Sequence, residues 1–263
     1  MPTIPIGEGS IHYREAGAGS DVVVLVHAFP LSSEMWEPQL SALAGRFRVI
    51  APDQRGLGRS VPTPEAATMD LVAGDLVTLL RQLGIRRACF AGLSMGGYVA
   101  FALWRRAPEL FRALALCDTK ATPDTTEAKE GRETYARNAL EKGIGWVADD
   151  FAPKLLKPNP DPAVDRRVRE LIKSNSPEGV AAAQRGMASR PDSVPTLAQI
   201  TCPTIAVRGA EDGVTSEADL LRISQGVKGA RLVTIPGAGH LPNLENPTAF
   251  NAALSSFFAA APR

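Results

Sequence analysis

The sequence predicts an α/β fold with a mostly parallel central sheet that is flanked by helices. Short apolar runs rich in β-branched residues alternate along the chain with helical patterns. The run Val22–His27 is almost continuously apolar, which is typical of a strand that is covered on both faces. A length of 263 residues is sufficient for one domain of this kind with an insertion.

Seven runs have the composition of strands. The first alternates apolar and polar residues, as a half-exposed strand does. In chain order, we expect strands at Ser10–Ala16, Val22–His27, Arg48–Asp53, Ala88–Leu93, Ala113–Asp118, Thr204–Gly209 and Arg231–Pro236. Helical patterns between them predict helices at about Met69–Leu83, Gly96–Arg106, Ala218–Gln225 and Pro247–Ala260. The first glycine-rich turn does not match a dinucleotide-binding fingerprint, so a nucleotide-binding fold has little support.

The sequence between Asp118 and Pro195 has a different character. It is rich in Arg, Lys, Glu and Pro and contains no strong strand run. Amphipathic patterns predict helices at Glu127–Lys142, Asp161–Asn175 and Pro177–Ser189. Parallel sheets bind ligands at the carboxyl ends of their strands. We therefore expect residues 119–195 to form a helical lid over that edge, with residues 1–118 and 196–263 forming the core.

Composition excludes several classes of partner. The net charge is +1, with 44% hydrophobic and 22% charged residues, so nothing indicates a nucleic acid or an anionic membrane. No apolar stretch is long enough to span a bilayer, and the first residues do not resemble a secretory signal. The three cysteines are expected to be buried free thiols, which fits a cytoplasmic protein.

A serine motif lies between an expected strand and an expected helix. Residues 92–96 read GLSMG and fit the G-x-S-x-G nucleophile elbow, in which a serine sits on a sharp turn after a strand. Such a turn exposes the hydroxyl and places it beside a base, which a serine needs in order to act as a nucleophile. We therefore predict that Ser94 is a catalytic nucleophile.

The base and the acid follow from chain order. Serine hydrolases of this architecture carry their triad in the order Ser, Asp or Glu, then His. The chain has three histidines, and only His240 follows Ser94. Asp212, in a loop after an expected strand, is the favoured acid; the neighbouring Glu211 and the earlier Asp118 are alternatives.

Acyl transfer also requires N–H donors for the developing oxyanion. The residue after the nucleophile, Met95, is expected to supply one backbone N–H. The second donor is expected in the loop after the strand Val22–His27, from the N–H of either Ala28 or Phe29.

These motifs together resemble the α/β-hydrolase superfamily. His27–Pro30 (HAFP) looks like its HGFP-type oxyanion loop, and Asp53–Ser60 (DQRGLGRS) looks like its D-x-R-G-x-G-x-S turn. The segments GLSMGG, GAEDGVTS and PGAGHLPNLENP lie in register with the family pattern, so the resemblance covers nearly all of the chain outside the lid. It implies an α/β-hydrolase fold with a helical lid inserted after the sixth strand.

The resemblance also implies roles for individual residues. The oxyanion donor of the HGFP-type loop maps onto Phe29, whereas Ala28 stands where glycine is usual. Asp53, Arg55 and His27 are implied to have structural roles. The 3-oxoadipate enol-lactonase-like and small carboxylesterase branch is the most similar, and the segment Gly186–Asp192 adds to that similarity.

We therefore expect hydrolysis of a small-molecule ester or lactone through an acyl-enzyme, with no metal and no cofactor. Candidate pocket residues are Ala28, Trp36, Met95, Trp146 and Met187. The lid arginines Arg185 and Arg190 either bind a substrate carboxylate or belong to a solvated face. Alternatives on the same residues are cofactor-free perhydrolysis, cleavage of a carbon–carbon bond, and a low-turnover receptor for a small molecule.

Overall fold

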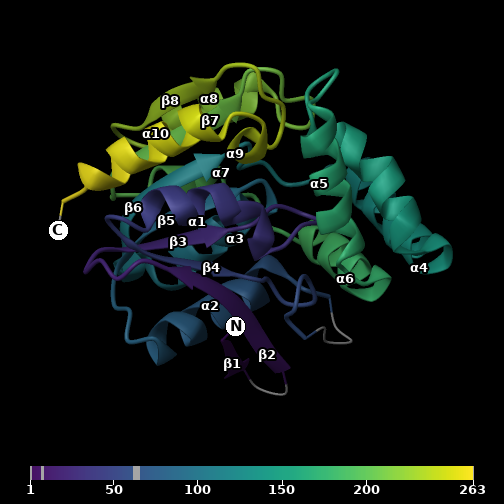
Figure 1. Ribbon diagram of the computed structural model, residues 1–263, viewed down its shortest axis with the longest axis horizontal. Helices are drawn as coiled ribbons and strands as arrows, with labels where there is room; N and C mark the ends of the chain where they lie inside the picture. The colour runs from purple at the N-terminus through teal and green to yellow at the C-terminus, as the bar shows by residue number, and fades with distance from the viewer. Residues whose placement is uncertain (1, 7–8, 62–65, 263) are drawn as a thin grey trace.

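A computed structural model of the chain describes residues 2–6, 9–61 and 66–262 (Figure 1). At its centre lies a sheet of eight strands in these residues, in the order β1-β2-β4-β3-β5-β6-β7-β8. The strands are β1 (Thr3–Ile6), β2 (Gly9–Ala16), β3 (Val22–Val26), β4 (Arg48–Pro52), β5 (Ala88–Leu93), β6 (Phe111–Cys117), β7 (Thr204–Gly209) and β8 (Arg231–Ile235). The pairs β1–β2 and β2–β4 are antiparallel, and all the others are parallel. The expected mostly parallel sheet is thus confirmed.

Burial explains why these segments are strands. Every residue of β5 and β6 is buried, as expected for central strands covered on both faces, whereas β8 at the edge is partly exposed. All seven expected strands are present, with ends shifted by at most two residues. Strand β1 was not expected, because it is only four residues long and contains Pro5; proline is tolerated there because β1 lies at the sheet edge.

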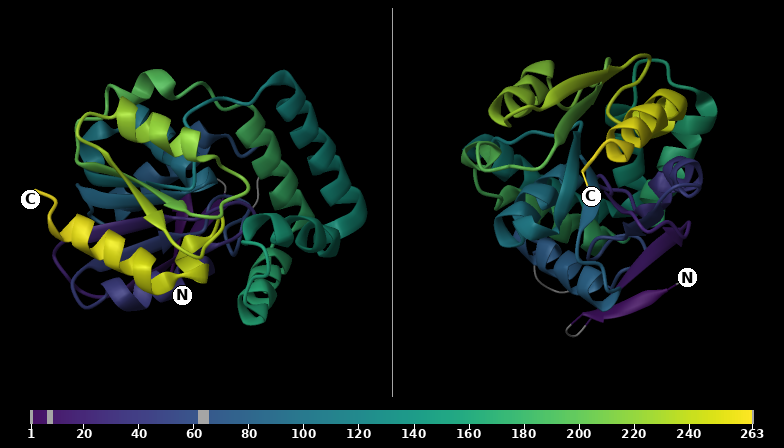
Figure 2. Two further views of the ribbon diagram at one scale, coloured as in Figure 1. Left: turned by 90° about the horizontal axis from the view of Figure 1, so that it is seen from above. Right: turned by 90° about the vertical axis from the view of Figure 1, so that its left-hand side faces the viewer.

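Helices cover both faces of the sheet (Figure 2, right). One face carries α1 (Glu37–Leu43) and α10 (Pro247–Ala259), which contact each other. The other carries α2 (Met69–Gln82), α3 (Met95–Arg106) and α8 (Glu217–Gly226). The short helical segments are η1 (Ser33–Trp36), η2 (Pro108–Leu110), α7 (Val194–Leu197) and α9 (Pro242–Glu245).

Three longer helices lie between β6 and β7 in sequence and to one side of the sheet in space (right in Figure 1). They are α4 (Thr126–Leu155), α5 (Pro162–Lys173) and α6 (Pro177–Ala188). Helix α4 is broken at Gly143, where φ is 79°, so the expected helix at Glu127–Lys142 is only its first arm. The second arm was not expected, and it contains Pro153, a residue that usually ends a helix. Helix α7 spans the expected lid boundary at residue 195.

The three cysteines, Cys89, Cys117 and Cys202, are all buried and unpaired, as expected. Among the helices of the described residues, none combines the length and the apolar character needed to span a bilayer.

Candidate active site

Ser94 occupies the turn between β5 and α3. Its backbone has φ 54° and ψ −113°, a conformation that is rare for residues other than glycine and costs free energy. The turn is held by a hydrogen bond from the Ser94 N–H to the Cys117 carbonyl, with an N···O distance of 2.8 Å. The Thr119 hydroxyl donates to the Ser94 carbonyl at 2.8 Å. Neighbouring parallel strands thus hold the strained serine in place.

The glycines on either side of Ser94 are required by close packing. A Cβ on Gly92 would lie 2.3 Å from the Gly96 carbonyl oxygen. A Cβ on Gly96 would lie 2.1 Å from the Val26 carbonyl oxygen on β3. Both obstacles are backbone atoms, so no side-chain rearrangement could relieve the overlap. The G-x-S-x-G spacing therefore follows from the close approach of α3 to β3 and β5.

His240 and Asp212 form a buried pair in the loops after β8 and β7. The His240 Nδ1 lies 3.0 Å from each carboxylate oxygen of Asp212, and the two side chains are 1% and 0% exposed. The Val214 N–H also donates to Asp212 at 2.8 Å, and the Thr215 hydroxyl donates to its other oxygen. Burial alone would raise the pKa of Asp212, but His240 and these hydrogen bonds lower it well below its usual range. Asp212 is therefore held as a carboxylate.

Ser94 and His240 both line a small cavity of about 70 Å³. Neither the Ser94 hydroxyl nor His240 Nε2 forms a hydrogen bond with another described residue. The cavity is lined by Phe29, Ser94, Tyr98, Lys120, Arg132, Phe151, Met187, Val214 and His240. These residues come from the loops after five parallel strands and from α3, α4 and α6. Ligand space thus exists at the carboxyl ends of the strands, where the sequence predicts it.

The two candidate donor loops differ in which N–H is available. The Ala28 N–H donates to Met35 Sδ at 3.3 Å. By contrast, neither the Phe29 N–H nor the Met95 N–H donates to another described residue. Of the two positions left open after β3, Phe29 is thus the one whose N–H is available to a ligand.

Some predicted pocket residues do not line the cavity. Met187 does, but Ala28, Trp36, Met95 and Trp146 do not. Trp36 is fully buried and packs against Phe250, with ring centroids 6.1 Å apart. Trp146 packs on Tyr135, with ring centroids 5.0 Å apart, on the second arm of α4. In both cases the indole is occupied by packing within the protein, which composition alone does not reveal.

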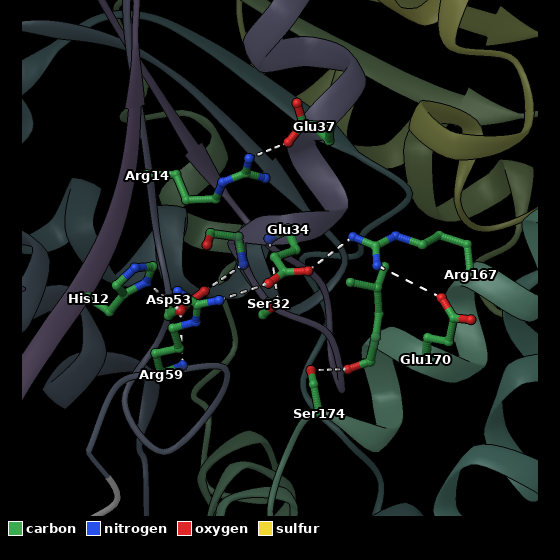
Figure 3. A network of polar contacts seen from close by, with 12 residues as sticks. His12, Arg14, Ser32, Glu34, Glu37, Asp53, Arg59, Arg167, Glu170 and Ser174 are labelled. Atoms are coloured by element: carbon green, nitrogen blue, oxygen red, sulfur yellow. Dashed lines mark hydrogen bonds and ion pairs between the residues drawn. The ribbon is translucent and has the colours of Figure 1, made fainter. Parts of the chain in front are cut away.

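Asp53, the aspartate of the DQRGLGRS turn, contacts several polar groups at once (Figure 3). Asp53 accepts the Ser33 N–H at 2.6 Å and the Arg59 N–H at 2.9 Å, and it contacts His12 Nδ1 at 2.8 Å. The neighbouring Arg55 forms a bidentate ion pair with Asp75 of α2. Its Nε and Nη2 donate to the two carboxylate oxygens at 2.9 and 2.6 Å. These contacts connect the turn to η1, β2 and α2. They are structural contacts, and neither Asp53 nor Arg55 lines the cavity.

His27 is likewise committed to loop structure. Its Nε2 accepts the Gln54 N–H at 2.8 Å, and its Nδ1 lies 2.9 Å from the Ala28 carbonyl oxygen. Both ring nitrogens are used, so His27 is not available to act on a ligand. Burial lowers its pKa, which favours the neutral ring that this arrangement needs.

Ion pairs connect the helices inserted between β6 and β7 to the rest of the molecule. Glu34 of η1 lies 3.0 Å from Arg167 of α5 and 3.7 Å from Arg59 of the turn (Figure 3). These groups are substantially exposed, so each pair contributes little to stability. They nevertheless place α5 directly against the segment that follows the Phe29 loop.

Sequence reasoning missed two cationic residues of the cavity, Lys120 and Arg132. Lys120 forms no ion pair or hydrogen bond with any described residue. Arg132 pairs with Asp124 and donates to Gln184 at 2.8 Å. Lys120 could have been found, since it lies two residues beyond the strand expected to end at Asp118. Arg132 could not, because a helical pattern does not reveal which helix face meets a cavity.

The lid arginines occupy two different environments. Arg185 is partly exposed and pairs with Glu133 at 2.9 Å, consistent with a solvated face. Arg190, by contrast, is 5% exposed, pairs with Asp124 at 2.7 Å and lies 4.2 Å from the centre of the Tyr98 ring. Neither arginine lines the cavity. Arg190 instead contacts two residues near the cavity, through the ion pair with Asp124 and by packing on the Tyr98 ring.

Neither alternative acid forms a hydrogen bond with His240 among the described residues. Glu211 is exposed. Asp118 is fully buried and comes within 4.8 Å of Asp212 and His240, but its Oδ1 accepts the Gly209 N–H at 2.7 Å. The hydrogen bonds of His240 go to Asp212. Asp118, Asp212 and His240 are also the one group in the described residues whose spacing could hold a metal ion.

Comparison with known proteins supports this picture. The model of the alpha/beta hydrolase family matches residues 23–253. The chain is 39% identical to a thermophilic esterase from Thermogutta terrifontis solved with malate bound; the match covers 95% of this chain and 93% of that one, with a TM-score of 0.93. It is 27% identical to 3-oxoadipate enol-lactonase 2 of Acinetobacter baylyi, over 97% of this chain and 95% of that protein. It is also 27% identical to a putative non-heme chloroperoxidase of Synechocystis, over 98% and 99%.

Proposed function

The chain belongs to the alpha/beta hydrolase family, and we propose that it hydrolyses a carboxylic ester or lactone of a small anionic molecule through an acyl-enzyme. The observation that carries this proposal is the cavity that both Ser94 and His240 line, with His240 paired to the buried carboxylate of Asp212. A serine, an imidazole and an ionised aspartate in this relation are the parts that acyl transfer needs.

In this mechanism the Ser94 hydroxyl attacks the substrate carbonyl while His240 Nε2 accepts its proton. Asp212, bonded to Nδ1, keeps Nε2 unprotonated in the resting state and stabilises the imidazolium that forms. His240 then returns the proton to the leaving oxygen. Water attacks the acyl-enzyme by the same steps and releases the acid. The Ser94–His240 hydrogen bond forms when substrate fills the cavity, since such bonds are often loose in empty sites.

The N–H groups of Phe29 and Met95 are proposed to bind the oxyanion of each tetrahedral intermediate. This role is supported by their lack of other acceptors in the described residues and by the engagement of Ala28 with Met35. Loss of one such donor typically lowers kcat by about 100- to 1000-fold.

The charge of the cavity favours a substrate with a carboxylate. Lys120 and Arg132 both line it, whereas Asp124, the anion that pairs with Arg132, also pairs with Arg190. The cations Lys120, Arg132 and Arg190 therefore outnumber Asp124 in this region. The malate-bound esterase and the 3-oxoadipate enol-lactonase, whose names refer to organic acids, support the same substrate class. The apolar remainder, with Phe29, Phe151 and Met187, would accept a short carbon chain.

Residues 119–195 are proposed to act as a lid. Arg132 and Phe151 of α4 and Met187 of α6 meet the strand-end residues across the cavity. Substrate size and charge would thus be selected by the inserted helices, while the chemistry belongs to the loops of the sheet.

Perhydrolysis is the second candidate, because one relative is named as a chloroperoxidase. Hydrogen peroxide would replace water in the attack on the same acyl-enzyme and yield a peracid. Adding peroxide to a hydrolysing sample and measuring peracid against acid would distinguish the two outcomes.

The test of the main proposal is a panel of simple esters, γ-lactones and enol-lactones, each offered with and without a carboxylate. We expect sustained turnover that is fastest on anionic members. Ser94→Ala should lose both this activity and labelling by a fluorophosphonate probe, while Ser224→Ala, a control in α8, keeps both. Labelling of folded Ser94→Ala would overturn the assignment of the nucleophile.

A further inference from the structure

Asp118 is a buried acid to which the proposed mechanism assigns no step. It directly follows β6 with φ 41°, in the left-handed region, where aspartate is among the better tolerated residues. Its side chain is inaccessible to solvent. Its Oδ1 accepts the Gly209 N–H at 2.7 Å, but Oδ2 is buried without a hydrogen-bond partner in the described part of the chain. An unpaired buried carboxylate oxygen is costly unless it carries a proton.

In the part of the chain that the structure describes, Asp118 forms no ion pair with a basic side chain. Asp212, after β7, and His240, after β8, each place a polar atom within 4.8 Å of it. The charge of Arg208 on β7 lowers the pKa of Asp118, but this effect is smaller than that of burial. The Arg208 guanidinium forms its ion pair with Glu217, at 3.7 Å. Cys117, the preceding residue, is a buried thiol. Asp118 therefore lies within 4.8 Å of another buried carboxylate.

Two carboxylates this close in a buried setting do not both ionise, so one retains a proton. We propose that Asp118 is a positioning residue that keeps a proton and donates it as a hydrogen bond to Asp212, so that the pair presents a single negative charge to His240. This inference rests on the function proposed above. Asp118 does not line the cavity, and it acts on the reaction only through Asp212.

The electrostatic surroundings of the two carboxyls agree with this assignment. Burial and the charge of Asp212 raise the pKa of Asp118 well above its usual range. The pKa of Asp212 is lowered, because the charge of His240 and the hydrogen bonds from His240, Thr215 and Val214 outweigh the effect of burial. The pKa values of the two groups are thus shifted in opposite directions, which favours the protonated acid at Asp118 and the carboxylate at Asp212.

The proton has a clear use in catalysis. A hydroxyl from Asp118 would help to fix the orientation in which the Asp212 carboxylate bonds His240, as the Thr215 hydroxyl also does. It would also keep the total charge beside the imidazole at one unit. A second negative charge would favour the imidazolium over the neutral ring, and an imidazolium cannot accept the Ser94 proton.

The first test detects the proton directly and needs no substrate. The infrared difference spectrum between the wild-type chain and Asp118→Asn at neutral pH should contain the C=O stretching band of a protonated carboxylic acid, with the isotope shift expected in D₂O. A spectrum with only the bands of a lost carboxylate would overturn the proposal. Because activity is not measured, this result is independent of the proposed function.

The second test measures the positioning role. Asparagine can still accept from Gly209 and donate to Asp212, so Asp118→Asn should keep kcat within about threefold of wild type. The acid limb of its pH profile of kcat/KM should not move. Asp118→Ala should lower kcat about tenfold or more with KM unchanged, corresponding to about 1.4 kcal/mol in the transition state.

Glu178→Gln, which removes an exposed carboxylate of α6, is the control and should match wild type. A downward shift of the acid limb by about one pH unit in Asp118→Asn would show that a charge was removed and would overturn the proposal. A kcat equal to that of wild type in Asp118→Ala would also overturn the proposal. If Asp118→Ala does not fold, the spectrum and the Asn profile still decide.

Discussion

Asn175, between α5 and α6, donates a hydrogen bond from Nδ2 to the Pro30 carbonyl at 2.8 Å. Its Oδ1 accepts the Gly58 N–H at 2.7 Å, and the side chain is buried. One amide of the inserted segment therefore holds the loop after β3 and the DQRGLGRS turn at once. The Phe29 N–H, the proposed oxyanion donor, lies one residue from the Pro30 carbonyl that Asn175 binds.

Asn175→Asp tests this link with little change in volume. The carboxylate keeps the acceptor for Gly58 but cannot donate to Pro30, so we expect a loss of stability of about 1–3 kcal/mol. We also expect kcat to fall about tenfold, because the Phe29 loop loses its support. Unfolding in urea and steady-state kinetics measure the two effects. Asn159→Asp, the same change at an exposed site, should alter neither, and wild-type kcat in Asn175→Asp would contradict the coupling.

Lys120→Met tests the charge of the cavity. Methionine keeps much of the side-chain volume and removes the ammonium. For anionic esters or lactones we expect kcat/KM to fall about tenfold, because a charge-assisted contact is lost. For neutral analogues kcat/KM should stay the same or rise. Lys129→Met, on the exposed part of α4, should affect neither class. An equal loss on both classes would contradict a carboxylate contact.

Two glycine substitutions test the packing of the elbow. Gly96→Ala should prevent folding or destabilise the chain severely, because the added Cβ would meet the Val26 carbonyl oxygen at 2.1 Å. Gly131→Ala in α4 is the matched control, since its Cβ would have no atom within 4 Å. It should stabilise the chain by about 0.5–1 kcal/mol through helix propensity. Thermal unfolding of both variants measures the contrast, which would be absent if α3 stood further from β3.

Asp124→Asn tests the buried ion pairs behind the cavity. Burial raises the pKa of Asp124, but hydrogen bonds from Arg190 and Arg132 outweigh it and lower the pKa to about 2. Because this lies below the usual value of about 3.9, the carboxylate stabilises the fold above about pH 4, and the contribution disappears as pH falls toward 2. At neutral pH the variant should lose about 3 kcal/mol, because Arg190 stays buried without its partner.

Calorimetry across this range checks the sign. The difference in Tm between wild type and Asp124→Asn should shrink as pH falls below 4. Glu178→Gln should show no such convergence, since its carboxylate is exposed. A difference that stays constant down to pH 2.5 would contradict the role assigned to Asp124.

Much of the fold could be predicted because its signals are local. Strands such as Ala88–Leu93 are continuous apolar runs. The N-termini of α2 and α10 are marked by the capping residues Thr68 and Asn246. The positions of Ser94, Asp212 and His240 followed from chain order and from turns just after strands. Strand β1 and the second arm of α4 carry Pro5 and Pro153, which argue locally against the structure they adopt.

The sequence by itself determined the strand runs and the elbow at Ser94, because each is a pattern of residues close together in the chain, and chain order limited the base to His240 and the acid to a few carboxylates. Only the tertiary structure decided that Asp212 rather than Asp118 bonds His240, that Lys120 and Arg132 line the cavity, and that Trp36 and Trp146 do not. Those outcomes depend on which faces meet when segments tens of residues apart pack together. Periodicity defines a face, but packing determines what that face contacts.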